Sequence, residues 1–312
     1  MIHIRAVSPA DVTPRLVEAL RTNAGVLNLI VLDGVARNPD GDAIECDVIA
    51  AQANRVLREL RALAVDRRGS IIIEEVGASL SDRATRAEGG APRGLGLAPI
   101  WEEAEARIRA GGRYPLSWFI LLTIAGLIGA VGIFTNSQIL IVGAMVVGPE
   151  YGAIASVALG LSKTSRTGVR AGVMALSVGF LIAVLATLVF SLVVRALSLQ
   201  PEVFTRGIRP VSTLIDSPNV FSVVVATLAG IVGVVSLVEA RTGALIGVFI
   251  SVTTIPAAAD IGVSMAFEDW SEASGSLVQL LLNVVILTAV GAVGLVVQRR
   301  LWRRIAQRTE AM

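Results

Sequence analysis

The chain has 312 residues and a formal net charge of +2, and it is 54% hydrophobic and only 17% charged. Soluble globular proteins carry about 25% charged residues, so this composition is typical of a membrane protein. A single cysteine and a single histidine exclude an internal disulfide and a metal site built from those residues. No basic stripe of the kind that binds nucleic acid is present, and we expect neither a cofactor nor a nucleic-acid partner.

The first 80 residues alternate strand and helix patterns in the order β-α-β-β-α-β. The predicted elements are strands at 2–7, 28–32, 43–49 and 70–76, and helices at 12–24 and 50–63. This order predicts a ferredoxin-like domain, which is either a small-ligand sensor or an assembly module. Asp33-Gly34 and Asn38-Pro-Asp-Gly41 predict turns. No signal peptide is recognisable, so we expect this domain in the cytoplasm.

Residues 81–113 connect this domain to the apolar part of the chain. Ser81 to Ala98 is rich in Gly, Arg and Pro, which is typical of a linker. Pro99 to Gly111 has an apolar face that includes Trp101 and Ile108, which predicts a short amphipathic helix beside the membrane. We expect this helix to lie at the membrane interface.

Residues 114–298 predict an all-α membrane domain. The 36 residues from Tyr114 to Pro149 carry no charge, whereas one spanning helix needs about 20 residues. We therefore predict two spans there and six in total. The predicted spans are 115–134, 138–161, 171–194, 220–238, 242–266 and 275–297.

The distribution of basic residues predicts the orientation of these spans. Lys163, Arg166, Arg170 and the basic tail at 299–312 fall on one predicted side, and the acidic group at 268–272 falls on the other. Basic loops stay in the cytoplasm. We therefore expect a multi-pass protein of a bacterial inner membrane, with both termini cytoplasmic.

The apolar domain contains a weak internal repeat. Ala125-Gly126 and Gly129 recur as Ala229-Gly230 and Gly233, and Gly143 recurs as Gly247, all at an offset of 104 residues. Three spans per copy would place the second copy upside down, as in many secondary transporters. The alternative is a chance similarity in composition, because Gly and Ala recur often in apolar helices.

The strongest candidate site is in the second predicted span, at Gly148-Pro149-Glu150, with Gly152 close behind. Proline breaks the helical hydrogen-bond ladder, and broken backbone at membrane depth is tolerated only where protein or water covers it. A carboxylate inside a membrane is costly and marks ion or proton pathways. The alternative interpretation of Glu150 is a structural hydrogen bond at a kink.

The fifth predicted span repeats this pattern with Thr253, Thr254 and Pro256, followed by Asp260. Proline-interrupted segments in matching halves indicate a midplane site, although hydroxyls next to a proline also bond freed carbonyls. Secondary candidates are Asn136 and Ser137, which would cap the second span, and Gln279 and Asn283, which share one helical face.

Two stretches of sequence resemble a known family. Asn136-Ser-Gln-Ile-Leu-Ile-Val-Gly-Ala-Met-Val-Val-Gly-Pro149 and the glycine- and proline-bearing segment 243–262 are similar to the domain of unknown function family 389. The resemblance covers about 115–297, and it implies a hydrophobic membrane protein without an assigned activity. Glu150-Tyr151 departs from it, because apolar residues are expected there.

Common enzyme signatures are absent from the sequence, including the Walker-type loop and the zinc-protease and serine-hydrolase motifs. We therefore expect a secondary transporter or channel for a small solute or ion rather than an enzyme. The cytoplasmic domain would regulate or assemble it, and the glycine-rich spans favour a homo-oligomer. The alternative is a membrane-anchored ligand sensor or scaffold that transports nothing.

Overall fold

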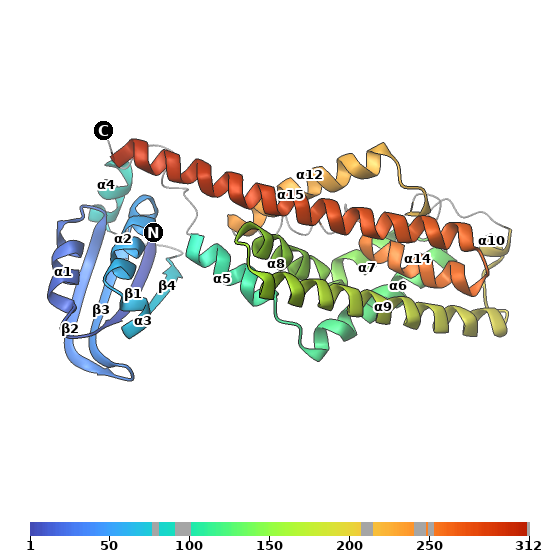
Figure 1. Cartoon of the computed structure of the whole chain (residues 1–312), viewed down its shortest axis with the longest axis horizontal. Coiled ribbons are helices and arrows are strands. Elements are labelled where there is room, and N and C mark those ends of the chain that lie inside the picture. The colour runs from blue at the N-terminus through green and yellow to red at the C-terminus, as the bar shows by residue number, and fades with distance from the viewer. Residues whose placement is uncertain (77–80, 91–100, 207–214, 240–247, 249–252, 311–312) are drawn as a thin grey trace. The chain divides into compact units, whose positions relative to one another are not determined.

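The computed structural model describes residues 1–76, 81–90, 101–206, 215–239, 248 and 253–310 (Figure 1). The chain divides into two compact units. One unit is Met1–Glu103 with Arg300–Met312, and the other, here called the membrane unit, is Ala104–Arg299.

The N-terminal unit contains a four-stranded antiparallel sheet in the order β2-β3-β1-β4. Its elements are β1 (Ile2–Ser8), α1 (Thr13–Thr22), β2 (Val26–Arg37), β3 (Asp40–Val48), α2 (Ala50–Ala62), α3 (Val65–Arg68), β4 (Ser70–Glu75) and α4 (Asp82–Gly90). The predicted order of strands and helices is present, with the four-residue α3 added before β4.

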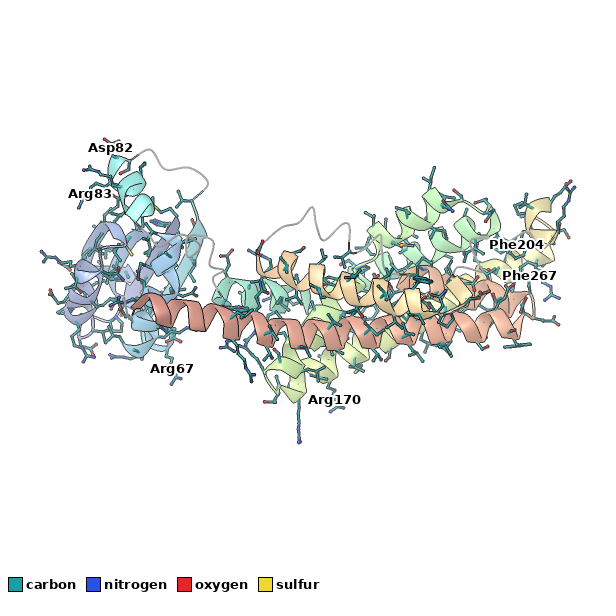
Figure 2. The ribbon with its side chains drawn as sticks, turned by 90° about the horizontal axis from the view of Figure 1, so that it is seen from above. Arg67, Asp82, Arg83, Arg170, Phe204 and Phe267 are labelled. Atoms are coloured by element: carbon teal, nitrogen blue, oxygen red, sulfur yellow. The ribbon has the colours of Figure 1, made fainter. Side chains whose placement is uncertain are left out.

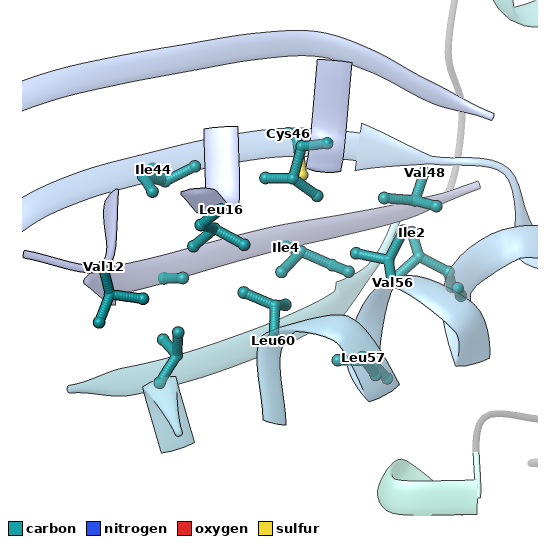
Figure 3. Packing of buried hydrophobic residues seen from close by; sticks show 14 residues of the cluster. Ile2, Ile4, Val12, Leu16, Ile44, Cys46, Val48, Val56, Leu57 and Leu60 are labelled. Atoms are coloured by element: carbon teal, nitrogen blue, oxygen red, sulfur yellow. The ribbon is translucent and has the colours of Figure 1, made fainter. Parts of the chain in front are cut away.

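The core of this unit lies between one face of the sheet and helices α1 and α2 (Figure 3). Alternate residues of β1 and β3, such as Ile4 and Ile44, are almost fully buried, as the two-residue period of a strand requires. Leu16 of α1 and Leu57 of α2 close the core from the helix side. Cys46 is part of this core, as its place in the strand pattern predicts.

One local prediction for this unit, the end of the second strand, is wrong. Asp33-Gly34 does not end a strand, because β2 continues to Arg37; Gly34 adopts a φ of +62°, and the pairing with β3 shifts register between Leu32 and Ala36. Such a bulge bends a strand without ending it. In the predicted linker, residues 82–90 form helix α4, and residues 91–98 lie outside the described part.

The membrane unit is helical. Its described elements are α5 (Trp101–Gly111), α6 (Leu116–Phe134), α7 (Gln138–Val147), α8 (Glu150–Ser162), α9 (Arg166–Ala196), α10 (Glu202–Thr205), α12 (Val220–Val238), α14 (Thr254–Ala266) and α15 (Trp270–Glu310). The helices α6, α9, α12 and α15 are long and apolar enough to cross a membrane, and α7 with α8 forms one further candidate, bent by 51°. Most of the first half of the predicted fifth span lies outside the described residues.

Contacts inside the membrane unit define two opposite ends. At the α5 end, Lys163, which follows α8, pairs with Glu105, and Arg107 binds the carbonyl of Leu237 near the end of α12. At the α10 end, Phe134 of α6 packs against Phe204 of α10 and against Phe267, which follows α14. Figure 2 shows Phe204 and Phe267 together at that end.

These contacts fix the direction of the helices. The helix α6 runs toward the α10 end, whereas α8 and α12 run toward the α5 end. The helices α9 and α14 both run toward the α10 end, because Arg195 near the end of α9 donates to the carbonyl of Ala266 at 2.5 Å and pairs with Glu268. α8 and α14 therefore run in opposite directions.

Helix α5 packs against other helices of the membrane unit. Ala104 and Ile108 are buried. At the end of α5, Gly111 approaches the backbone of Gly152 so closely that a Cβ on Gly152 would lie 3.1 Å from the Gly111 carbonyl oxygen. The ion pair and carbonyl contact made by Glu105 and Arg107 are further attachments to the unit.

The elements of the membrane unit recur at the offset of 104 residues. The helix α12 begins and ends 104 residues after α6, α14 begins and ends 104 residues after α8, and α15 begins 104 residues after α9. The turns repeat as well: Thr164 and Glu268 have φ values of +55° and +64°. The hydrogen bond from Ser165 N to Gly160 O recurs as Asp269 N to Ser264 O.

Candidate functional site

The candidate site lies where the first helical break occurs, between α7 and α8. α7 ends with the Gly148 N–H on the Ala144 carbonyl, and Pro149 occupies the position before the first residue of α8. Proline is tolerated there, because no intrahelical donor is needed at a helix start. The indole Nε1 of Trp118, on α6, donates to the Pro149 carbonyl at 3.2 Å. The predicted break at Gly148-Pro149 is therefore present, and a neighbouring helix covers its backbone.

Glu150 is the first residue of α8 and is buried, with 5% of its surface exposed. Its Oε1 accepts a 2.8 Å hydrogen bond from the hydroxyl of Thr254, the first residue of α14. Its other oxygen, Oε2, has no hydrogen-bond partner among the described residues. The structure thus joins two predicted site residues that stand 104 positions apart, and it leaves one buried carboxyl oxygen unsatisfied.

The preceding residue, Thr253, binds a pair of amides on α15. Its Oγ1 accepts from Asn283 Nδ2 at 3.0 Å and from Gln279 Nε2 at 3.2 Å. Gln279 and Asn283 lie four residues apart, on one face of α15, and both are buried. Gln279 Oε1 has no partner among the described residues. These two secondary candidates therefore join the main site.

Two helix starts meet at this point, here called the junction, defined by Glu150, Thr253 and Thr254. From the junction α8 runs to the α5 end and α14 runs to the α10 end. Each helix has 13 residues, so the junction lies about 20 Å along the helix from either end at 1.5 Å per residue. The N-terminus of a helix carries a partial positive charge, which favours a carboxylate nearby.

Gly148 allows the two helices to approach this closely. A Cβ at Gly148 would collide with the side chain of Ile255 and lie 2.5 Å from Glu150 Oε2. Pro256 is the third residue of α14, where its missing N–H again costs no intrahelical bond. The second predicted break therefore appears as a helix that begins beside its proline. Residues 249–252, which precede it, lie outside the described part.

Asp260 is buried but belongs to a separate cluster. It lies six residues after Thr254 on α14, about 9 Å along the helix. Its Oδ2 accepts from Ser276 at 2.6 Å and lies 3.5 Å from Ser264 Oγ, which also lies 3.5 Å from Glu272 Oε2. The structure does not bring Asp260 to the junction.

Asn136 and Ser137 also lie away from the junction. They form the turn between α6 and α7 at the α10 end, where Asn136 has a φ of +51° and the Ser137 side chain accepts from Leu140 N. Their role is helix capping. Gly152 contacts α5 rather than the junction.

Two contacts were missed by the sequence. Trp118, near the start of the first predicted span, is buried beside Gly179 and bonded to the Pro149 carbonyl. Ser276, the partner of Asp260, showed no signal beyond a polar residue in an apolar helix. Both contacts join residues far apart in the chain, so no local pattern could have found them.

Comparison with known proteins gives one match. Residues 145–289 match the family model described as "Domain of unknown function (DUF389)". This part of the chain is similar to the DUF389 family. This confirms the resemblance based on the glycine- and proline-bearing segments. No curated protein and no solved structure matches the chain.

The DUF389 segment begins in α7, three residues before the break, and ends in α15, six residues after Asn283. It therefore contains every residue of the junction and both amides that bind Thr253. The N-terminal unit and α6, which supplies Trp118, lie before the segment.

Proposed function

We propose that this protein carries a small solute or ion across the membrane, as a secondary transporter or channel, and that it catalyses no reaction. The observation that carries the proposal is the buried hydrogen bond between Glu150 and Thr254 at the meeting point of two helix starts. Broken helices with a carboxylate at midmembrane depth are typical of transport pathways. Glu150 would hold the ion or proton, and Thr253 and Thr254 would line the pathway.

We further propose that the membrane unit has six spans arranged as an inverted repeat of three and three. The matched helix bounds and turns support this arrangement, as do the opposite directions of α8 and α14. A pair of exchanged contacts supports it too. Gly262 packs against Thr187, and Gly291 packs against Ala158. At the 104-residue offset Gly262 corresponds to Ala158 and Gly291 corresponds to Thr187, so each contact becomes the other when the two copies are interchanged. Such exchange is expected of a pseudo-two-fold axis.

In the proposed orientation the α5 end faces the cytoplasm of a bacterial cell and the membrane is the inner membrane. Lys163, Arg166 and Arg170 are near the α5 end, and Glu268 and Asp269 are at the α10 end. Because basic loops stay in the cytoplasm, this distribution supports the proposed orientation. Both termini would then be cytoplasmic.

We propose that the N-terminal domain is ferredoxin-like and regulates or assembles the membrane unit. The antiparallel sheet order β2-β3-β1-β4, with α1 and α2 on one face, supports that fold. Helix α5 comes between this domain and the first span, and its contacts with Lys163 and Leu237 provide a route for regulation.

A homo-oligomer remains our prediction. The glycines that favour close packing are largely used inside the chain. Gly126 packs against Ala183, Gly179 packs against Trp118, and Gly230 packs against Val290. Gly143, by contrast, has open space around its Cα, so α7 is the helix on which a second copy could be sought.

Reconstitution in liposomes tests the transport proposal. Purified full-length protein should produce flux of at least one inorganic ion or small metabolite, and Glu150→Gln should reduce that flux at least tenfold. Glu202→Gln removes an exposed carboxylate of α10 by the same chemical change and should leave the flux unaltered. Absence of flux across a broad ion and metabolite panel, together with ligand binding by the full chain, would favour the sensor or scaffold alternative.

A further inference from the structure

We infer that the ion bound at the junction is a proton, held on Oε2 of Glu150, and that transport by this protein is coupled to protons rather than to a metal cation. This inference rests on the proposed transport function and specifies its coupling ion. Three observations support it: the hydrogen bonds made by the oxygens of the junction, the ionisable groups of the surrounding helices, and the position of the junction between the two ends of the membrane unit.

The described side chains of the junction offer few oxygens to a metal ion. Glu150 Oε1 and Thr254 Oγ1 are bonded to each other, and Thr253 Oγ1 already accepts two amide hydrogens. The oxygens without a partner among the described residues are Glu150 Oε2 and Gln279 Oε1. Hard cations such as calcium take about six to eight oxygens, whereas a proton needs one acceptor.

Among the described residues, no salt bridge joins Glu150 to a cation. α6, α7 and α12 contain no ionisable residue, and the one acid of α14 is Asp260, which bonds to Ser276. The arginines of α9 lie at its ends, at positions 166, 170 and 195. On α5, Glu105 pairs with Lys163, and Arg107 donates to Leu237 O.

Helices α8 and α15 also carry ionisable groups. Tyr151 follows Glu150 in α8, and its phenol packs against Gly233 of α12. On α15, Glu272 bonds to Ser264, and the arginines begin at residue 299, 16 positions after Asn283. A carboxylate buried without a paired cation is costly, and binding a proton removes that charge without any other ligand.

The proposed step needs no other reactant. A hydronium ion on one side of the membrane gives a proton to Oε2, so that its own O–H bond breaks, the carboxyl O–H bond forms and water is left. On the other side the carboxyl O–H bond breaks, and water accepts the proton as hydronium. The junction lies about 20 Å along a helix from either end, so neither side is favoured by distance. The residue that takes the place of Glu150 in the other copy is Thr254, which cannot carry a proton in this way, so the junction holds one proton.

Infrared difference spectroscopy on the full-length protein in lipid tests this inference without any transported substrate. A carbonyl band of a protonated carboxyl group should appear as the pH is lowered, and it should be absent from Glu150→Gln and present in Glu202→Gln. Its midpoint pH should stay constant when sodium or potassium replaces an organic cation. In Thr254→Val the band should persist at a shifted frequency, because one hydrogen bond to the carboxyl group is lost.

Two results would overturn the inference. A midpoint that falls as sodium or potassium increases would show that a metal cation competes with the proton for Glu150. A spectrum in which no titrating band depends on Glu150 would show that this group binds no proton; Thr254→Val then decides the case if Glu150→Gln fails to fold. Lack of flux in liposomes with a normally titrating band would count against transport and leave the proton site standing.

Discussion

Glu150 and Thr254 share a hydrogen bond that is buried in the middle of the membrane unit. Each residue alone has an ordinary structural explanation, as a kink acid and as a hydroxyl near a proline. Together they tie the starts of two helices that run in opposite directions. The pair therefore holds the break of α7 and α8 against the start of α14. In the proposed function, this is the place where the ion is held.

At the residue scale we predict that Thr254→Val destabilises the protein through Glu150. Removing the hydroxyl leaves a second buried carboxyl oxygen unsatisfied, which costs about 1–3 kcal/mol. A double-mutant cycle with Glu150→Gln should give a coupling energy of about 1 kcal/mol, measured by denaturant unfolding in detergent. Thr227→Val is the matched control, because the Thr227 hydroxyl bonds only to a carbonyl of its own helix, that of Val223. Additive effects of the two substitutions would contradict the pairing.

A second residue-scale prediction concerns Asp42 in the N-terminal unit. Hydrogen bonds from the Thr13 hydroxyl and the Gly34 N–H lower the pKa of this buried carboxyl below its ordinary value of 3.8. The ionised group therefore stabilises the fold above that value, and its contribution is lost as the pH falls through the folded pKa.

Asp42→Asn should consequently speed hydrogen exchange of the β2 and β3 amides at pH 7. The difference from the wild type should shrink only as the pH falls below 3.8, because the wild-type carboxyl then becomes protonated too. Exchange in the full-length protein, followed by mass spectrometry, measures this. A difference that has already disappeared above pH 3.8 would contradict the assignment.

At the element scale, the break between α7 and α8 requires glycine at position 148. Gly148→Ala should cost about 1–3 kcal/mol, because its Cβ would collide with Ile255 of α14. Gly143→Ala, five residues earlier in α7, meets nothing within 4 Å and should be neutral or stabilise by up to about 1 kcal/mol. Thermal unfolding in detergent compares the two. Equal effects would show that α7 and α14 do not pack closely.

Helix α5 is the second element whose contacts make a prediction. Lys163→Glu should loosen α5 by repelling Glu105, and the exchanged pair Glu105→Lys with Lys163→Glu should restore its attachment. Protease sensitivity of the 91–113 region reports on this attachment. Loss of the exposed pair between Glu202 and Arg206 should have no such effect. Failure of the exchanged pair to restore protection would contradict a specific ion pair.

At the scale of the whole molecule, the proposed inverted repeat would explain why helix bounds recur at one offset. Two copies that fold alike but point in opposite directions would place both helix starts at the same depth. Their sequences have diverged at the junction, where one copy supplies a carboxyl group and the other a hydroxyl. One ionisable site at the interface of two similar copies is consistent with the proposed exchange between an outward-open and an inward-open state.

Cysteine labelling tests the proposed topology directly. Burial raises the pKa of the Cys46 thiol to about 12, so the native cysteine should not react with thiol reagents at neutral pH. Cysteines introduced at Thr135 and Ser198 should label from outside intact cells, and one at Thr164 should label only after the membrane is opened. Labelling of positions 135 and 164 from the same side would show that α7 and α8 form a re-entrant loop instead of a span.

The sequence alone determined the features that depend on neighbouring residues. Apolar runs predicted α6 and α12 to within one residue of their bounds, Gly148-Pro149 predicted the break, and alternation predicted the strands β1 and β3. The family resemblance also depended on contiguous segments. These signals are local, because helix and strand periods and the missing N–H of proline act within a few residues.

Only the tertiary structure decided which distant residues meet. It paired Glu150 with Thr254, placed Trp118 on the Pro149 carbonyl and gave Asp260 to Ser276 instead of the junction. It also attached α5 to the membrane unit. The physical reason is that a hydrogen bond across more than 15 residues depends on how helices pack and in which direction they run, and one helix's sequence specifies neither.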